Sequence, residues 1–180
     1  MVKKKSRQKK QKLLKLDLAC GGNKQPGFHG VDIAKLPNVD QVVNLEKFPW
    51  PWADESVEEV FCSHYIEHTP DLIAFMDELY RILVVGGKVT VYAPYYSSMR
   101  AWQDPTHKRA ISEATFLYYN KGWRESQKLD HYPIKCDFDF TYGYLLAPEW
   151  AARAIDVQQF AIHHYINVVN DIAVTLTKRG

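Results

Sequence analysis

Small and acidic residues follow two apolar segments in the first third of the chain. The run Asp17–Gly22 reads DLACGG, so an apolar segment ends there in a turn of small residues. Gly21 and Gly22 have no Cβ, which lets the backbone approach a ligand closely. Asp32 ends the next apolar segment, and a carboxylate at that place can accept hydrogen bonds from both hydroxyls of a ribose. These residues together predict a site for a nucleoside-containing cofactor.

A third apolar segment ends in Asn44-Leu45-Glu46. The amide of Asn44 can both donate and accept hydrogen bonds, which suits the edge of an adenine. Ligands of open parallel sheets bind beyond the carboxyl ends of the strands, so the three segment ends are expected to meet at one edge. The phosphate-binding pattern GxGxxG does not occur in the sequence, which disfavours NAD and FAD.

A second motif, HYIEH at residues 64–68, fits the H-x-x-E-H pattern of inverted zinc proteases. In that pattern two histidines on one helical face bind Zn²⁺ and the glutamate acts as a base. Here the motif begins where a strand is expected to end, and Thr69-Pro70 is expected to open a helix just after it. We therefore predict no metal site, and a zinc hydrolase remains an alternative.

The third group of polar residues lies in Pro94–Arg109, which reads PYYSSMRAWQDPTHKR. His107 is the candidate general base for removing a proton from a substrate, and Asp104 can orient it. Arg109, together with Arg100, can hold an anionic group such as a phosphate or carboxylate. The alternative is a lid whose polar residues hold one another in place.

The elements that position these residues alternate between strands and helices. A helix is predicted after Thr69 as its N-cap, with one apolar face, and Gly86-Gly87 is expected to end it. A second helix is expected near Ser112–Tyr119 and a third over Pro148–Tyr165. The third would carry Trp150, Ala154, Val157, Ala161 and Tyr165 on one stripe. Strands are predicted at Leu13–Ala19, His29–Ile33, Gln41–Leu45, Val57–Ser63, Lys88–Tyr92, Asp137–Leu146 and Ile172–Thr177.

This order predicts an α/β fold. The connections between the first three strands are too short for full helical crossovers, which need about 10–12 residues. We therefore expect reduced helices there. One face of the sheet should be thinly covered, or covered by the 94–135 segment and the loop around Trp50-Pro51-Trp52.

The motifs LDLACGG…GVD, VNLEKFPWPWADESVEEVFCSHYIEH and FMDELYRILVVGGKVTVYAP resemble a class I S-adenosylmethionine-dependent methyltransferase of the type-11 kind, over roughly residues 14–93. The resemblance implies a Rossmann-like, mostly parallel seven-stranded sheet with an antiparallel last hairpin, and S-adenosylmethionine as cofactor. It places the methionine part near the glycine turn, the ribose on Asp32, the adenine at the third strand end and the sulfonium at the fourth. The implied cofactor-binding residues are Asp17, which fixes the loop, and Ala19, Cys20, Gly21, Gly22, Asp32, Ile33, Asn44, Leu45, Ser63 and His64.

Composition fits one folded domain with a basic tail. The chain has 180 residues, 46% of them apolar and 24% charged. Eight basic residues and no acidic ones occur in residues 1–15. We predict a disordered basic tail at 1–12 and one methyltransferase domain at 13–180, with a lid on the acceptor side at 94–135. The three separated cysteines and the lack of a long apolar run predict a cytoplasmic protein without a secretory signal or membrane span.

The predicted function is methyl transfer from S-adenosylmethionine to an oxygen or nitrogen of a small, anionic acceptor. One alternative is a nucleic-acid methyltransferase that uses the basic tail on phosphates. Another is a non-catalytic partner that holds the cofactor, and a third is the zinc hydrolase. The sequence leaves the oligomeric state open.

Overall fold

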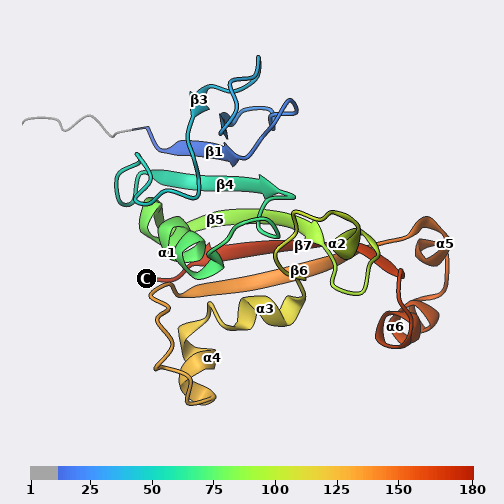
Figure 1. Ribbon diagram of the computed structural model, residues 1–180. Helices are drawn as coiled ribbons and strands as arrows, with labels where there is room; N and C mark the ends of the chain where they lie inside the picture. The colour runs from blue at the N-terminus through green and yellow to red at the C-terminus, as the bar shows by residue number, and fades with distance from the viewer. Residues whose placement is uncertain (1–11) are drawn as a thin grey trace, which may run out of the picture.

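The computed structural model describes residues 12–180, and these form one seven-stranded sheet in the order β3-β2-β1-β4-β5-β7-β6 (Figure 1). Strands β1 to β5 pair in parallel, whereas β7 runs antiparallel to both β5 and β6. This confirms the predicted sheet with its antiparallel last hairpin. The strands are β1 Leu14–Leu18, β2 His29–Asp32, β3 Gln41–Val42, β4 Val57–Ser63, β5 Leu83–Pro94, β6 Phe138–Leu146 and β7 Val169–Lys178.

All helices in residues 12–180 come after β4. The first three connections between strands therefore lack a helix, and the short spacings predicted reduced helices for the first two of them. None of the described helices has the length and apolar content that crossing a bilayer requires. The helices are α1 Leu72–Ile82, α2 Arg100–Gln103, α3 Glu113–Leu117, α4 Lys121–Ser126, α5 Pro148–Ala151 and α6 Ile155–His164. The predicted basic tail lies outside the described residues, apart from Lys12.

The core lies between one face of the sheet and α1. Phe75 and Met76 of α1 are fully buried. Trp50 belongs to the loop at residues 48–52, which we call the tryptophan loop, and it packs edge-on against Phe75 with 5.3 Å between ring centroids. Farther along the sheet, Phe116 of α3 lies 6.1 Å from Phe140 of β6. The tryptophan loop and the 94–135 segment thus extend the cover that α1 begins.

The opposite face of the sheet, which we call the open face, is thinly covered. The pairing register places Phe61, Thr90 and Thr175 side by side on β4, β5 and β7, and all three are only half-buried. Lys15 and Glu59 pair on the same face at 2.6 Å, and both remain partly exposed. Parallel sheets normally bury both faces, so this chain departs from the usual arrangement in the direction that its short connections predicted.

Two predictions about α1 were wrong. Its N-cap is Asp71, whose Oδ1 accepts a hydrogen bond from the Ala74 amide at 2.9 Å, whereas Thr69 is buried in the preceding loop. The helix also ends before the glycine pair, because Leu83 is already extended and begins β5. Two β-branched residues follow Leu83, and residues of this type favour a strand.

The predicted helix over Pro148–Tyr165 is interrupted, because Ala154 has an extended backbone and separates α5 from α6. Of its predicted apolar stripe only Ala161 is buried, while Val157 and Tyr165 are exposed. Figure 1 shows the reason, since α5 and α6 stand beyond the end of the sheet toward which the β4 and β5 arrows point. The stripe therefore has little of the core to pack against.

Candidate active site

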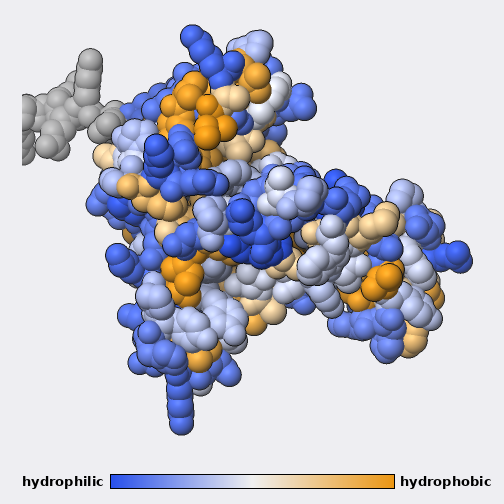
Figure 2. Space-filling view, in the orientation of Figure 1, coloured by the Kyte–Doolittle hydropathy of each residue, from blue (hydrophilic) through white to orange (hydrophobic). Residues whose placement is uncertain are grey.

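A cavity of about 240 Å³ lies at the carboxyl ends of the first three strands. It brings together five of the residues that sequence reasoning assigned to the cofactor, and three others, Val43, Glu46 and Tyr65, that it missed. Next to this cavity, apolar surface is gathered over β3, where Ile33 and Val42 are exposed (Figure 2). The five assigned residues in the lining are Ala19, Asp32, Ile33, Asn44 and Leu45.

The turn after β1 is held in an unusual backbone conformation. Ala19 and Gly21 both have positive φ angles, 55° and 52°. A residue with a Cβ pays about 1–2 kcal/mol for this conformation, so Ala19 stores strain at the edge of the cavity. A Cβ built on Gly21 or Gly22 would meet nothing within 4 Å, which leaves open space beside the turn for a ligand.

Asp32 ties this turn to the end of β2. Its Oδ2 accepts from the Gly21 amide and its Oδ1 from the Ala34 amide, each at 2.9 Å. An ionised carboxylate has about four acceptor positions, so two remain for the hydroxyls of a ribose.

Asp17, at the end of β1, also stabilises the segment that follows this strand. It is buried, its Oδ2 accepts from the Gln25 amide at 2.6 Å, and its burial raises the pKa of the carboxyl group. Burial also raises the pKa of the neighbouring Cys20 thiol. Cys20 is therefore poorly suited to act as a nucleophile.

The tryptophan loop shapes the side of the cavity that Asn44 and Leu45 line. The Asn44 side chain accepts from the Glu46 amide at 2.9 Å, which makes a tight turn after β3. The Leu45 carbonyl accepts from the indole Nε1 of Trp50 at 3.2 Å. Because Trp50 is itself locked into the core, the third strand end has a fixed position.

Ser63 and His64, which were assigned to the sulfonium, do not line this cavity. His64 has a positive φ of 54°, and its Nδ1 lies 3.5 Å from Oε1 of Glu67. The Glu67 carboxylate raises the pKa of His64. The His64 ring thus lies toward Glu67, in the turn that follows β4.

Residues 64–68 form a bend and a turn, and none of them is helical. The two histidines of the HYIEH motif therefore do not share a helical face. His68 instead meets His107, with 4.7 Å between ring centroids. The geometry of an inverted zinc protease, which the alternative hypothesis requires, is not formed.

The three predicted catalytic residues, His107, Asp104 and Arg109, line one pocket of about 360 Å³ in the 94–135 segment. His107 Nδ1 is 2.9 Å from the Ala101 carbonyl, an acceptor that requires this nitrogen to carry the proton. Nε2 is then the basic atom of the ring. The predicted orienting bond from Asp104 is not formed, because its Oδ2 is 3.9 Å from Nε2 and its Oδ1 accepts from the Thr106 amide and hydroxyl. The orienting group is the Ala101 carbonyl.

Both arginines of this segment are already bonded within the chain. Arg109 donates to the carbonyls of Ile66, Thr69 and Pro70 and so holds the loop before α1. Arg100 pairs with Asp171 of β7 at 2.5 Å. Nothing in the residue types distinguishes an arginine bound to backbone carbonyls from one that awaits an anion.

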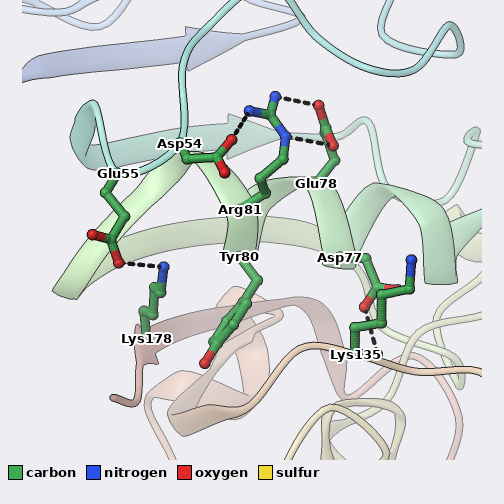
Figure 3. Close-up of a pocket in the computed structure, with 8 residues that line it drawn as sticks. All are labelled: Asp54, Glu55, Asp77, Glu78, Tyr80, Arg81, Lys135 and Lys178. Atoms are coloured by element: carbon green, nitrogen blue, oxygen red, sulfur yellow. Dashed lines mark hydrogen bonds and ion pairs between the residues drawn. The ribbon is translucent and has the colours of Figure 1, made fainter.

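A larger cavity of about 510 Å³ lies at the other end of the sheet, near the starts of β4 and β5 and the end of β7. Figure 3 shows that five of its charged side chains pair with one another, those of Asp54, Glu55, Glu78, Arg81 and Lys178. Arg81 bonds Glu78 at 2.5 Å and Asp54 at 2.6 Å, and Lys178 lies 3.3 Å from Glu55. Since ligands of such sheets bind at the carboxyl ends, we place no cofactor here.

A methyltransferase-domain family model matches residues 16–91 of the chain. Among curated proteins, a sterol methyltransferase-like protein from Botryococcus braunii is 27% identical over 133 residues, which cover 68% of this chain and 33% of that protein. The chain thus spans about a third of the length of this relative.

Two solved structures are similar in fold. One is a SAM-dependent methyltransferase from Archaeoglobus fulgidus, with a TM-score of 0.65, 17% identity, and coverage of 93% of this chain and 87% of that one. The other is phosphoethanolamine N-methyltransferase 2 from Haemonchus contortus in complex with S-adenosyl-L-methionine. It has a TM-score of 0.52, 15% identity, and coverage of 97% and 50%.

Proposed function

We propose that the chain is a class I S-adenosylmethionine-dependent methyltransferase that uses S-adenosylmethionine as its cofactor and methylates an oxygen or nitrogen of a small acceptor molecule; the matching methyltransferase-domain model and the similar folds support this. The observation that carries the proposal is the pair of sites: a cavity of about 240 Å³ lined by Asp32 at the carboxyl ends of the first strands, and a second pocket lined by His107. The first suits a cofactor and the second suits an acceptor that must lose a proton.

The residues of the first cavity fit the nucleoside part of the cofactor. The free acceptor positions of Asp32 would bind the two ribose hydroxyls. Asn44 and Leu45 would border the adenine, and the exposed Ile33 side chain offers an apolar face to its ring. The cofactor, when bound, supplies an activated methyl group, so the chain itself has to align the acceptor and take up its proton.

His107 would take up that proton through Nε2. The Ala101 carbonyl fixes both the orientation of the ring and its tautomer, which is the role that general-base catalysis requires of a partner group. Asp104 would act on the pocket through its charge alone, since it bonds Thr106 rather than His107.

We propose a small molecule as the acceptor and do not assign it a charge. The expectation of an anion rested on Arg100 and Arg109, and both have partners inside the chain. The similar proteins do not indicate a charge for the acceptor. One is named for a sterol, which is uncharged, and another was solved with phosphomonomethylethanolamine, which is charged. The nucleic-acid alternative rested on the basic tail, which lies outside the described residues.

The test measures transfer of a labelled methyl group from S-adenosylmethionine to a panel of acceptors: a phosphorylated amine, a phenol, a carboxylic acid, a sterol and an oligonucleotide. We expect transfer to one of the small molecules. His107→Ala should lower kcat by about 10²–10⁴-fold while the Kd for the cofactor stays within about twofold.

His131→Ala, a change in the loop after α4, is the matched control and should retain activity. Full activity of His107→Ala would remove His107 as the base. A folded wild-type chain that binds the cofactor but methylates nothing in the panel would favour the non-catalytic cofactor-binding partner. Transfer to the oligonucleotide alone would favour the nucleic-acid alternative.

A further inference from the structure

Glu67, His68 and His107 bring one carboxylate and two imidazoles together beside the acceptor-side pocket. One ligand atom from each residue lies within 4.8 Å of the other two. Glu67 and His68 come from the turn after β4, and His107 comes from the segment after β5, so the cluster exists only because the fold joins these segments. The backbone bond from the Lys108 amide to the Glu67 carbonyl, at 2.8 Å, fastens the two segments at this place.

The Glu67 side chain points independently to a missing cation. It is only 2% exposed, and within residues 12–180 neither carboxylate oxygen has a hydrogen-bond partner. The His64 ring approaches Oε1 at 3.5 Å, which is too long for a good hydrogen bond. Burial of a carboxylate without partners is costly, and proteins normally pair such a group or coordinate a metal with it.

The hydrogen bonds around both histidines leave a lone pair free on each ring. The Thr106 hydroxyl donates to Asp104 at 2.7 Å, so toward His68 Nδ1, 3.0 Å away, it can act only as an acceptor. His107 Nδ1 donates to the Ala101 carbonyl. In each ring Nδ1 therefore carries the proton and Nε2 is unprotonated. Metal-binding histidines show this arrangement, in which an outer partner fixes the second ring nitrogen.

We propose that Glu67, His68 and His107 bind a divalent transition-metal ion of the Zn²⁺ type. Two imidazoles and one carboxylate match the three protein ligands of zinc sites that keep an open position. Mg²⁺ and Ca²⁺ prefer oxygen ligands, so the two nitrogens select against them. Bonds of about 2.1 Å would place the ligand atoms about 3.4 Å apart, so the distances between them must shorten by up to about 1.4 Å from the present limit of 4.8 Å.

This inference goes beyond the proposed methyl transfer and does not rest on it, but both involve Nε2 of His107. A metal ion on this nitrogen would occupy the lone pair that the proposed general base needs, so Zn²⁺ and proton uptake by His107 exclude each other. The test is calorimetric titration of the full chain, first stripped of metal by a chelator, with Zn²⁺ and with Mg²⁺. We expect one Zn²⁺ per chain and no Mg²⁺ binding. Glu67→Gln and His107→Ala should each weaken Zn²⁺ binding at least tenfold. Thr106→Val, which leaves all three ligands in place, should weaken it to a smaller degree by freeing the His68 ring.

His64→Gln is the matched control, because it alters a histidine of the same motif that touches Glu67 but lies outside the cluster. It should leave Zn²⁺ binding unchanged. Binding that is lost in His64→Gln but retained in His107→Ala would replace the proposed site by the HYIEH motif. Equal binding of Mg²⁺, or no Zn²⁺ binding by a wild-type chain that still binds the cofactor, would overturn the proposal.

Thermal melting gives a second measurement, which can be interpreted even where a variant is less stable than the wild type. The melting temperature of the wild-type chain should rise with Zn²⁺ concentration, because a ligand that binds only the folded state stabilises it. Glu67→Gln should show no such rise, whatever its melting temperature without metal. A rise equal to that of the wild type would contradict the assignment of Glu67 as a ligand.

Discussion

The Gly21 amide donates to the Asp32 carboxylate across 2.9 Å, so one side chain at the end of β2 shapes the turn that follows β1. The same carboxylate also accepts from the Ala34 amide. Asp32 is thus a part of the cavity before any ligand arrives. Its role in shaping the turn and its proposed role in binding ribose can be separated by substitution.

Asp32→Ala should reduce affinity for both S-adenosylmethionine and S-adenosylhomocysteine by more than tenfold, because it removes the ribose acceptor and loosens the turn. Asp32→Asn keeps one acceptor oxygen and should lose less. Calorimetric titration measures both, with NAD as the ligand that should not bind. Asp54→Asn, at the opposite end of the sheet, is the control. Unchanged affinity in Asp32→Ala would mean that the cofactor binds elsewhere.

Arg109→Lys should destabilise the chain by about 2 kcal/mol, since a single ammonium nitrogen cannot reproduce the rigid fork in which two guanidinium nitrogens bond the three carbonyls. Urea unfolding measures this loss, and Arg153→Lys at an exposed position is the matched control. If Arg109 instead binds an anionic acceptor, the substitution would raise KM for that acceptor and leave stability unchanged. That result would restore the expectation drawn from sequence.

Trp50→Ala should cost about 3–5 kcal/mol of unfolding free energy, because it removes a buried ring that packs on Phe75. Cofactor affinity should fall as well, since the bond from Trp50 Nε1 to the Leu45 carbonyl positions the strand end where we propose that the adenine binds. Trp102→Ala changes a side chain that is 70% exposed, and its effect should stay within about 0.5 kcal/mol. Equal losses in the two variants would contradict this account of the tryptophan loop.

Asp40 should make the stability of the chain depend on pH in acid. Its pKa is lowered mainly by the hydrogen bond from Lys24 and to a smaller degree by the bond from the Gly30 amide. A carboxyl group with a lowered pKa in the folded state stabilises the chain above its unfolded pKa of about 3.9, and this contribution is lost as pH falls through the folded value. Asp40→Asn keeps an acceptor for Gly30 but cannot titrate. Urea unfolding between pH 7 and pH 2 should therefore show a shallower acid loss in Asp40→Asn than in the wild type.

The first half of the sheet, with the cavity at its carboxyl edge, was predictable because it is encoded locally. The apolar run of β4 has the predicted bounds, Val57–Ser63, and Asp32 is the last residue of the short strand β2, whose end the chain direction alone assigns to the carboxyl edge. In such segments alternation and chain order determine where each side chain lies. The same holds for the buried face of α1, which includes Phe75 and Leu79.

The acceptor side was less predictable, because its contacts join segments with no periodic pattern. The Ala101 carbonyl that orients His107 is a backbone group, and every residue type has one, so the residue type does not predict this bond. The partners of Arg109 are backbone carbonyls as well. His68 and Glu67 were noticed as parts of one motif, but their contact with His107 depends on how residues 94–109 fold back over the turn after β4.

The open face has a consequence for how the stability of this chain responds to temperature. The heat capacity of unfolding increases with the apolar area that folding removes from water, and for ordinary domains it averages about 12–15 cal/mol/K per residue. Here Phe61, Thr90 and Thr175 keep part of their surface in contact with solvent. We expect a heat capacity change below that average in calorimetry. A smaller heat capacity change flattens the stability curve, so this thinly covered sheet should lose stability slowly both on warming and on cooling from its optimum.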